Sequence, residues 1–94
     1  MDAKILHWAE QRDLLKHENA PKQFMKLVEE VGELSNAMLK NNISEQIDAI
    51  GDIQVVLIIL SEQLGINYDE ALKSAYNVIK ERTGKTINGT FIKD

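Results

Sequence analysis

The sequence predicts an all-α fold, a four-helix bundle-like arrangement with a short C-terminal hairpin or tail, assembled as an oligomer. Apolar residues recur at helical spacing along most of the 94 residues, and an Asn-Gly pair separates two short β-prone segments near the end. One predicted helix is apolar nearly all round, so a chain of this length leaves it partly uncovered by its own residues. The length also suggests a single domain, residues 1–94.

The first two helices are predicted at about residues 3–16 and 21–40. Asp2 is the expected N-cap of the first helix, whose apolar residues make no clean stripe. The segment HENAPKQ interrupts the pattern, and Pro21 suits the first turn of the second helix, where a missing N–H leaves no hydrogen bond unmade. The second helix has one apolar stripe at the spacing of a buried face: Phe24, Leu27, Val31, Leu34 and Met38.

The third helix is predicted at about residues 45–64, with Ser44 or Asn42 as its N-cap and Gly65 as its C-terminal stop. Its stretch IQVVLIIL has the composition of a buried strand. The apolar pattern extends well beyond this stretch in both directions, which is too long for a typical strand and favours a helix. Because such a helix is buried on every side, a second subunit is expected to cover its exposed face.

The fourth helix is predicted to begin near Asn67, which has capping-box spacing with Glu70, and to end near Thr83. The tail that follows contains Asn88-Gly89, the usual signal of a two-residue hairpin turn. An isolated two-stranded hairpin is marginal in water, so this one is expected to pack on the helices or on another chain.

The composition excludes several classes of protein. The formal net charge of −4 argues against a general affinity for nucleic acid, because phosphate backbones are bound by basic surfaces. The absence of cysteine excludes disulfides and thiolate zinc sites. The charged N-terminus has no apolar region of a secretory signal, and the longest apolar run is too short to cross a membrane. We therefore expect a cytoplasmic protein with neither a nucleic-acid nor a membrane partner.

Two rows of carboxylates fall on neighbouring predicted helices. Glu30 and Glu33 lie on one flank of the second helix, beside Lys26. Asp48 and Asp52 are one turn apart on the third helix, on a face that continues into its most apolar part. Unpaired carboxylates are costly to bury, and a hard divalent cation bound by oxygen ligands offsets that cost. The two rows therefore predict a metal site between the helices.

Simpler roles for these side chains stay open. The acidic row of the second helix can be a solvated flank paired with Lys26 or Lys40, and Asp48 can complement the helix macrodipole in a first turn. Trp8 can belong to the core or stack on a base. The residues near the end of the fourth helix can serve its C-terminus: Asn77, Lys80, Arg82 and Lys85.

The motifs EEVGEL and DAIGDIQVVL resemble the MazG-type nucleotide pyrophosphohydrolases of the all-α NTP pyrophosphatase superfamily, in their small single-domain, phage-like form. The family pattern is EExxE, a spacer and then ExxD opening an apolar helix, and the resemblance covers most of the chain. It implies a homodimer or homotetramer that uses Mg²⁺, or Mn²⁺ as a substitute. The implied reaction cleaves a nucleoside triphosphate, NTP or dNTP, into a monophosphate and pyrophosphate.

The resemblance also implies roles for individual residues. Glu30 and Glu33 match the second and third Glu of EExxE and are the expected catalytic residues and metal ligands, and Asp52 matches the Asp of ExxD. The Glu of ExxD falls at Ala49, so the chain departs from the pattern, and Asp48 is the candidate replacement as a ligand. The expected substrate-binding residues are Lys26, Trp8, Asn77, Lys80 and Arg82.

Two other functions stay open beside a hydrolase that cleans the nucleotide pool. A dUTPase-like or modified-nucleotide-specific enzyme would share the same carboxylates, because base selection depends on the shape of the pocket. A non-catalytic helical module for oligomerisation or regulation is kept open by the departure at Ala49.

Overall fold

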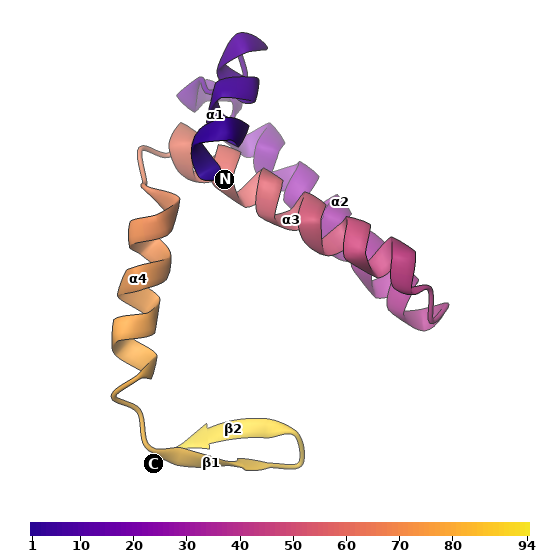
Figure 1. The fold of residues 1–94 in the computed structure, drawn as a ribbon, viewed down its shortest axis with the longest axis vertical. Coiled ribbons are helices and arrows are strands. Elements are labelled where there is room, and N and C mark those ends of the chain that lie inside the picture. Colours follow the sequence, from indigo (N-terminus) through magenta and orange to yellow (C-terminus); the bar gives the residue numbers. More distant parts are fainter.

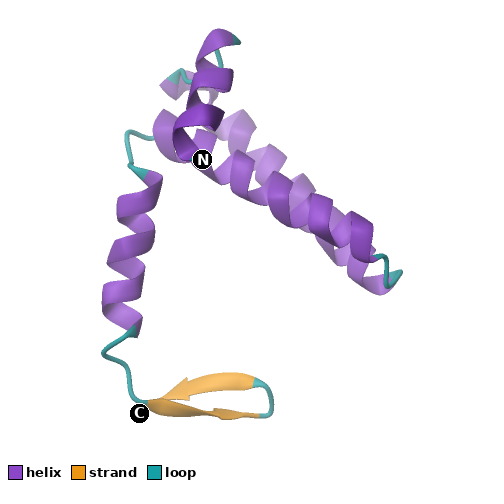
Figure 2. Cartoon of the chain, viewed as in Figure 1, coloured by secondary structure: helices purple, strands orange, loops and turns teal.

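The computed structural model describes residues 1–94 and shows four α-helices followed by one antiparallel hairpin (Figures 1 and 2). The all-α class with a short C-terminal hairpin is confirmed. The elements are α1 (Asp2–Gln11), the short 3-10 helix η1 (His17–Asn19), α2 (Ala20–Leu39), α3 (Ile43–Gln63), α4 (Tyr68–Ile79), β1 (Gly84–Ile87) and β2 (Thr90–Lys93).

Helices α2 and α3 form an antiparallel helical hairpin that is the main body of the fold (Figure 1). Their contact follows a repeat of three and four residues, as in coiled coils. Near the connecting loop, Gln46 Nε2 donates a hydrogen bond to the Ala37 carbonyl at 3.4 Å, which links the two helices there. The seam consists of Ala20, Gln23, Leu27, Glu30, Leu34 and Ala37 on α2, and Gln46, Ala49, Ile53, Val56, Leu60 and Gln63 on α3.

The apolar stripe predicted for α2 is correct for two of its five residues. Leu27 lies in the seam, as does Leu34, but Phe24, Val31 and Met38 are 52%, 50% and 59% exposed. The helices meet along a row that lies to one side of the predicted stripe. As a result, Glu30 lies within the contact between the helices and not on its flank, which corrects the prediction.

The segment after α1 differs from the prediction, because α1 ends at Gln11 and not at residue 16. Asp13 adopts a positive φ of 59°, which Asp tolerates better than most residues, and this turns the chain. Gln63 of α3 stabilises the turn by two contacts. Its side-chain Nε2 donates a hydrogen bond to the Leu14 backbone carbonyl at 2.6 Å, and its backbone carbonyl oxygen lies 2.8 Å from His17 Nδ1. α1 packs across α3 by means of the fully buried Ala9.

The start of each later helix follows local rules that the sequence displays. The side-chain oxygen of Asn42 accepts a hydrogen bond from the Glu45 amide, and that of Asn67 accepts one from the Glu70 amide, so these two predicted N-caps are confirmed. The predicted cap at Asp2 is wrong, because α1 begins at Asp2 and Met1 precedes it. Asn42 rather than Ser44 caps α3. α4 ends at Ile79, earlier than predicted.

α4 leaves α3 at an angle of 104° and carries the hairpin away from α2 and α3 (Figure 1). We call α4 and the hairpin, residues 68–94, the arm. Asn88 and Gly89 have φ values of 52° and 82°, as the predicted two-residue turn requires. No residue of α4 or of either strand is buried.

None of the helices alone has the length and apolar character of a membrane span. Only the bent pair of α3 and α4, taken together, meets the length and composition of a broken span.

Candidate functional site

A polar cavity of about 380 Å³ opens on one flank of the α2–α3 hairpin, toward its loop. It brings together three of the predicted site residues, Glu33, Asp48 and Asp52. On α2, Glu33 is followed at spacings of three and four positions by Asn36 and Lys40, which places them on one flank of the helix. On α3, Glu45, Asp48 and Asp52 have the same spacing. The remaining lining residues are Asn36, Lys40, Glu45 and Ala49.

Glu30 lies beside this cavity, inside the seam. The residue is 6% exposed, and its Oε2 atom has no hydrogen-bond partner. The only cation paired with it is Lys26, whose Nζ lies 3.8 Å from Glu30 Oε1. Burial raises the pKa of Glu30 above its usual range. The charge of Glu33, a hydrogen bond with the Glu33 side chain and then the charge of Asp52 raise it further, while Lys26 lowers it. Glu30 is therefore a buried carboxylate with too few partners. The alternative in which it belongs to a solvated surface is wrong.

A second cavity, of about 430 Å³, lies on the hairpin toward α1 and contains two more of the predicted residues, Lys26 and Trp8. Val55 and Ile59 of α3 form part of its apolar wall, and Asp52 of the acidic cavity is one turn before Val55. Trp8 is 46% exposed, so it is not a core residue. The Arg12 guanidinium lies 4.3 Å from the centre of its ring.

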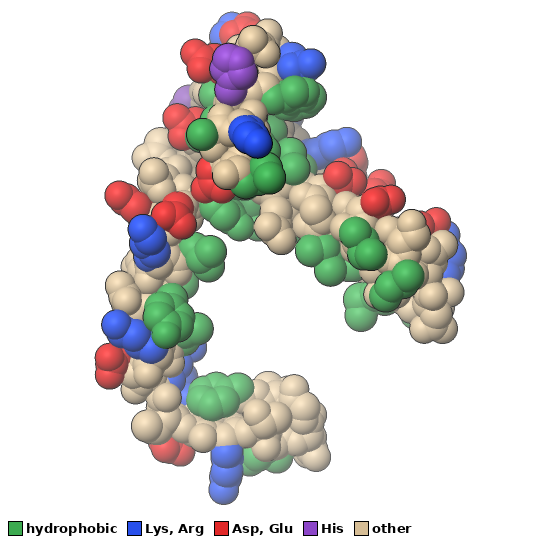
Figure 3. Space-filling model, in the orientation of Figure 1, with side chains coloured by type: hydrophobic (Ala, Val, Ile, Leu, Met, Phe, Trp, Pro, Cys, Tyr) green, Lys and Arg blue, Asp and Glu red, His purple; other side chains and the backbone are tan.

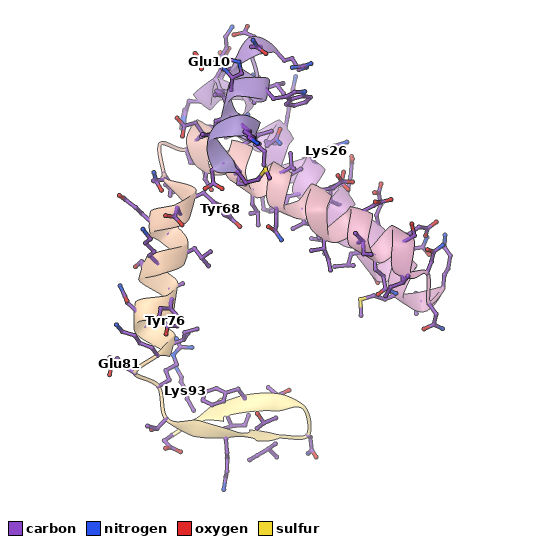
Figure 4. The ribbon with its side chains drawn as sticks, in the orientation of Figure 1. Glu10, Lys26, Tyr68, Tyr76, Glu81 and Lys93 are labelled. Atoms are coloured by element: carbon purple, nitrogen blue, oxygen red, sulfur yellow. The ribbon has the colours of Figure 1, made fainter.

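The other predicted substrate-binding residues are not brought to these cavities. Asn77 lies on α4, and Lys80 and Arg82 follow directly after it. None of them lines either cavity. Figure 4 shows the neighbouring Tyr76 and Glu81 at the end of α4 that is remote from Lys26. Within one chain, these residues therefore do not reach the acidic cavity.

Sequence reasoning missed Asn36 and Lys40 as cavity residues. Their spacing from Glu33, three and seven positions, was the available signal. Lys40 pairs with Glu45 at 3.3 Å across the loop and not with the carboxylates of α2. Lys40, the cationic side chain at this end of the cavity, therefore leaves Glu33 free to bind another group.

The carboxylates have the right chemistry for a hard divalent cation, but they are not gathered into a coordination sphere. No three of the Asp, Glu and His side chains are close enough together to hold an ion in this conformation. Oxygen atoms are the ligands that Mg²⁺ prefers, and the unpartnered Oε2 of buried Glu30 is the group that most lacks a positive partner. The donor set fits a cation that would draw Glu30, Glu33, Asp48 and Asp52 together.

Ala49 explains how the departure from the expected motif is accommodated. Its side chain is 4% exposed and lies in the seam, where a Glu would add a further buried carboxylate near Glu30. Ala49 also lines the acidic cavity, and Asp48, one position earlier, supplies a carboxylate to the same wall. This chain therefore has Asp48 and Asp52 as the two aspartates of α3 on the cavity wall, beside an Ala in the position of the expected Glu.

The flank that carries these residues lies within a region that matches a known family. Residues 8–82 match the family described as phosphoribosyl-ATP pyrophosphohydrolase. The chain belongs to this family. Every predicted site residue lies inside the matched region, and the all-α pyrophosphohydrolase superfamily expected from the motifs is confirmed. The MazG type within it stays a prediction.

A phage protein is similar to part of the chain. It is described as an uncharacterized 18.2 kDa protein in the rep-hol intergenic region of Haemophilus phage HP1 (strain HP1c1). The two are 46% identical over 59 residues, which is 63% of this chain and 36% of the relative. The chain thus matches about a third of the length of this relative. No solved structure matches the chain.

Proposed function

We propose that this protein is a Mg²⁺-dependent pyrophosphohydrolase that cleaves an NTP or dNTP into a nucleoside monophosphate and pyrophosphate, and so cleans the cytoplasmic nucleotide pool. The observation that carries the proposal is the acidic cavity with the under-partnered Glu30 beside it, in a chain of a pyrophosphohydrolase family. An acidic cavity repels a triphosphate unless a cation reverses the local field.

The cation would be held by Glu33, Asp48 and Asp52 on the cavity wall and by Glu30 beside it. When bound, Mg²⁺ would neutralise phosphate oxygens and lower the pKa of a bound water. Mn²⁺ takes the same oxygen ligands and would substitute for it. Glu30 would accept a proton from the attacking water if the cation leaves one of its oxygens free, since it lies beside the cavity and not on its wall. Glu33 is the alternative acceptor.

The neighbouring cavity would bind the rest of the substrate. Lys26 lies between the two cavities, because it lines the second and pairs with Glu30 beside the first. Its exposed ammonium group is placed to contact a phosphate. Trp8, with Val55 and Ile59, offers an apolar surface for a base or sugar.

Asn77, Lys80 and Arg82 would bind the triphosphate only on another copy of the chain. They do not reach the acidic cavity of their own chain, and Lys80 and Arg82 supply the positive charge that phosphates require. This proposal therefore places the substrate between subunits of a homodimer or homotetramer.

Pyrophosphate release tests the function. The purified chain is incubated with Mg²⁺ and each common NTP and dNTP, and with phosphoribosyl-ATP, the substrate in the family's description. We expect pyrophosphate and the matching monophosphate in equal amounts, and no release by Glu33→Gln. Release of orthophosphate instead, or no turnover of any triphosphate, would contradict the proposal.

The second candidate is a non-catalytic helical module. It is favoured by the absence of any three acidic side chains close enough to hold an ion, and by Ala49 in the position of an expected ligand. Such a module would show no Mg²⁺-dependent rise in melting temperature, whereas a specific metal site must raise it. A dUTPase-like or modified-nucleotide preference would instead appear in the release assay as turnover of one substrate.

A further inference from the structure

Lys40 is the one cationic side chain that lines the acidic cavity. The same cavity is lined by the carboxylates of Glu33, Glu45, Asp48 and Asp52. The charge of one divalent cation does not neutralise these carboxylates together with the phosphates of a nucleotide. A further positive group is therefore required at the phosphates, and Lys40 is the group that this chain places in the cavity.

Lys40 lies at the end of the cavity that is nearer to the α2–α3 loop, in the C-cap position of α2. It follows Glu33 by seven positions, which is about 10 Å along the axis of a helix. Its backbone keeps helical angles, with φ −84° and ψ −4°. Because the side chains of a helix lean toward its N-terminus, the Lys40 side chain leans from the loop toward Glu33.

The ammonium group of Lys40 is available to a ligand, because its ion pair is weak. Lys40 Nζ lies 3.3 Å from Glu45 Oε2, and the two side chains are 52% and 49% exposed. Exposed ion pairs contribute little to stability, since water screens them. A phosphate carries more negative charge than one carboxylate and offers more acceptor oxygens. It can therefore replace Glu45 as the partner of Lys40 at little cost.

The two cavities lie in a fixed order along the α2–α3 hairpin. The cavity that contains Trp8 and Lys26 lies toward α1, and the acidic cavity lies toward the loop. Figure 3 shows acidic side chains along the edge of the hairpin that runs from α1 to the loop. A nucleotide with its base at Trp8 therefore has its phosphates directed along this edge toward Lys40.

We propose that Lys40 binds the terminal phosphate of a nucleoside triphosphate and then holds the pyrophosphate that leaves. The proposal rests on the proposed function, which places cleavage between the α and β phosphates in the acidic cavity. In that reaction a water oxygen bonds to the α-phosphorus and one proton of the water passes to a carboxylate. The bond from the α-phosphorus to the bridging oxygen breaks, and its electron pair leaves with pyrophosphate. The Lys40 ammonium stabilises the negative charge that pyrophosphate gains.

A purely structural role for Lys40 makes a different prediction. In that role Lys40 only joins α2 to α3 across the loop through its ion pair with Glu45. Lys40→Met and Glu45→Gln break the same ion pair, so they would then have the same effect. If Lys40 binds phosphate, the two substitutions have opposite effects on the affinity for pyrophosphate, because Glu45→Gln removes a competing anion and Lys40→Met removes the cation.

Isothermal titration calorimetry of the full chain in millimolar Mg²⁺ tests the proposal without turnover. The ligands are the two kinds of product, pyrophosphate and, separately, dAMP, dCMP, dGMP and dTMP. We expect Lys40→Met to weaken the binding of pyrophosphate by about tenfold or more, because a hydrogen bond between charged groups is lost. The binding of each monophosphate should change by less than about twofold, since Lys40 does not contact that part of the substrate. Glu45→Gln should bind pyrophosphate more tightly than the wild type.

Lys16→Met is the matched control, because Lys16 also forms an exposed ion pair, with Asp13 at 3.0 Å, but lines no cavity. It should bind pyrophosphate as the wild type does. A wild type that does not bind pyrophosphate, or a Lys40→Met variant that binds it as well as the control, would overturn the proposal. Equal weakening of pyrophosphate and monophosphate binding would also overturn it. If the products bind as expected but no triphosphate is hydrolysed, the proposed function fails and Lys40 is still a pyrophosphate-binding residue.

Discussion

The substitution Glu30→Gln removes the one buried charge in the seam while keeping the size and shape of the side chain. Glu30 is 6% exposed, its Oε2 has no partner, and Lys26 at 3.8 Å is too far for a hydrogen bond. We expect the variant to be more stable than the wild type at neutral pH without divalent metal, and inactive.

The size of the effect follows from that geometry. A buried polar group without a partner costs about 1–3 kcal/mol, and more when charged. The neutral amide of Gln still lacks a partner, so part of this cost remains. We therefore expect the free energy of unfolding to rise by about 1 kcal/mol. In a domain of this size, such a gain raises the melting temperature by about 4–8 °C.

The pH dependence has a defined sign. The pKa of Glu30 is raised above its ordinary value of 4.5, so the folded chain holds this proton more tightly than the unfolded chain. The stability contributed by Glu30 is complete below that ordinary value and is lost as the pH rises through the raised pKa. The melting temperature of the wild type should therefore fall, relative to that of Glu30→Gln, as the pH rises through this range.

Thermal melting by circular dichroism in EDTA, across a pH series, is the assay. The two proteins should melt alike at acid pH and diverge as Glu30 ionises, and millimolar Mg²⁺ should narrow the difference by stabilising only the wild type. A variant that melts below the wild type at neutral pH in EDTA would show that Glu30 is not strained in the seam and would refute this reasoning.

Four further outcomes are expected. Glu33→Gln should abolish pyrophosphate release with unchanged helix content by circular dichroism, and residual turnover would remove Glu33 from the site. Asp52→Asn should lose most of the Mg²⁺-dependent rise in melting temperature, and an undiminished rise would exclude Asp52 as a ligand. Gly84→Ala places a Cβ against the backbone of β2, so cross-strand NMR contacts should vanish, whereas Gly32→Ala, which has open space, should keep them. Mixing inactive Glu33→Gln with inactive Arg82→Ala should restore part of the activity, and a mixture as inactive as its components would show that Arg82 does not act between chains.

Those parts of the fold that depend on a few neighbouring residues were predictable from the sequence. The Asn67 cap needs only an amide three positions later, the stop at Gly65 needs only a residue that tolerates a positive φ, and Asn88-Gly89 sets its turn alone. The acidic cavity was likewise predictable in part, because one-turn spacing places Asp48 and Asp52 on the same flank.

Features that depend on contacts between distant segments were not predictable. Two apolar rows compete on α2, and only the approach of α3 decides that Leu27 is inside and Val31 outside, which also places Glu30 in the seam. The early end of α1 depends on Gln63, 49 positions from Leu14 along the chain. The direction of the arm follows from the connection at Gly65. The periodicity of apolar residues within a helix carries no information about that direction.

Paramagnetic broadening by Mn²⁺ tests the metal site most directly, because it locates the ion without requiring turnover. In ¹⁵N-labelled protein, sub-stoichiometric Mn²⁺ should first broaden the amide signals around Glu30, Glu33, Asp48 and Asp52. The amide signals of the β1–β2 hairpin should stay unchanged. The same addition to Asp52→Asn should leave most of these signals sharp. Broadening that begins elsewhere, or that spreads evenly over the acidic surface, would contradict a metal site between α2 and α3.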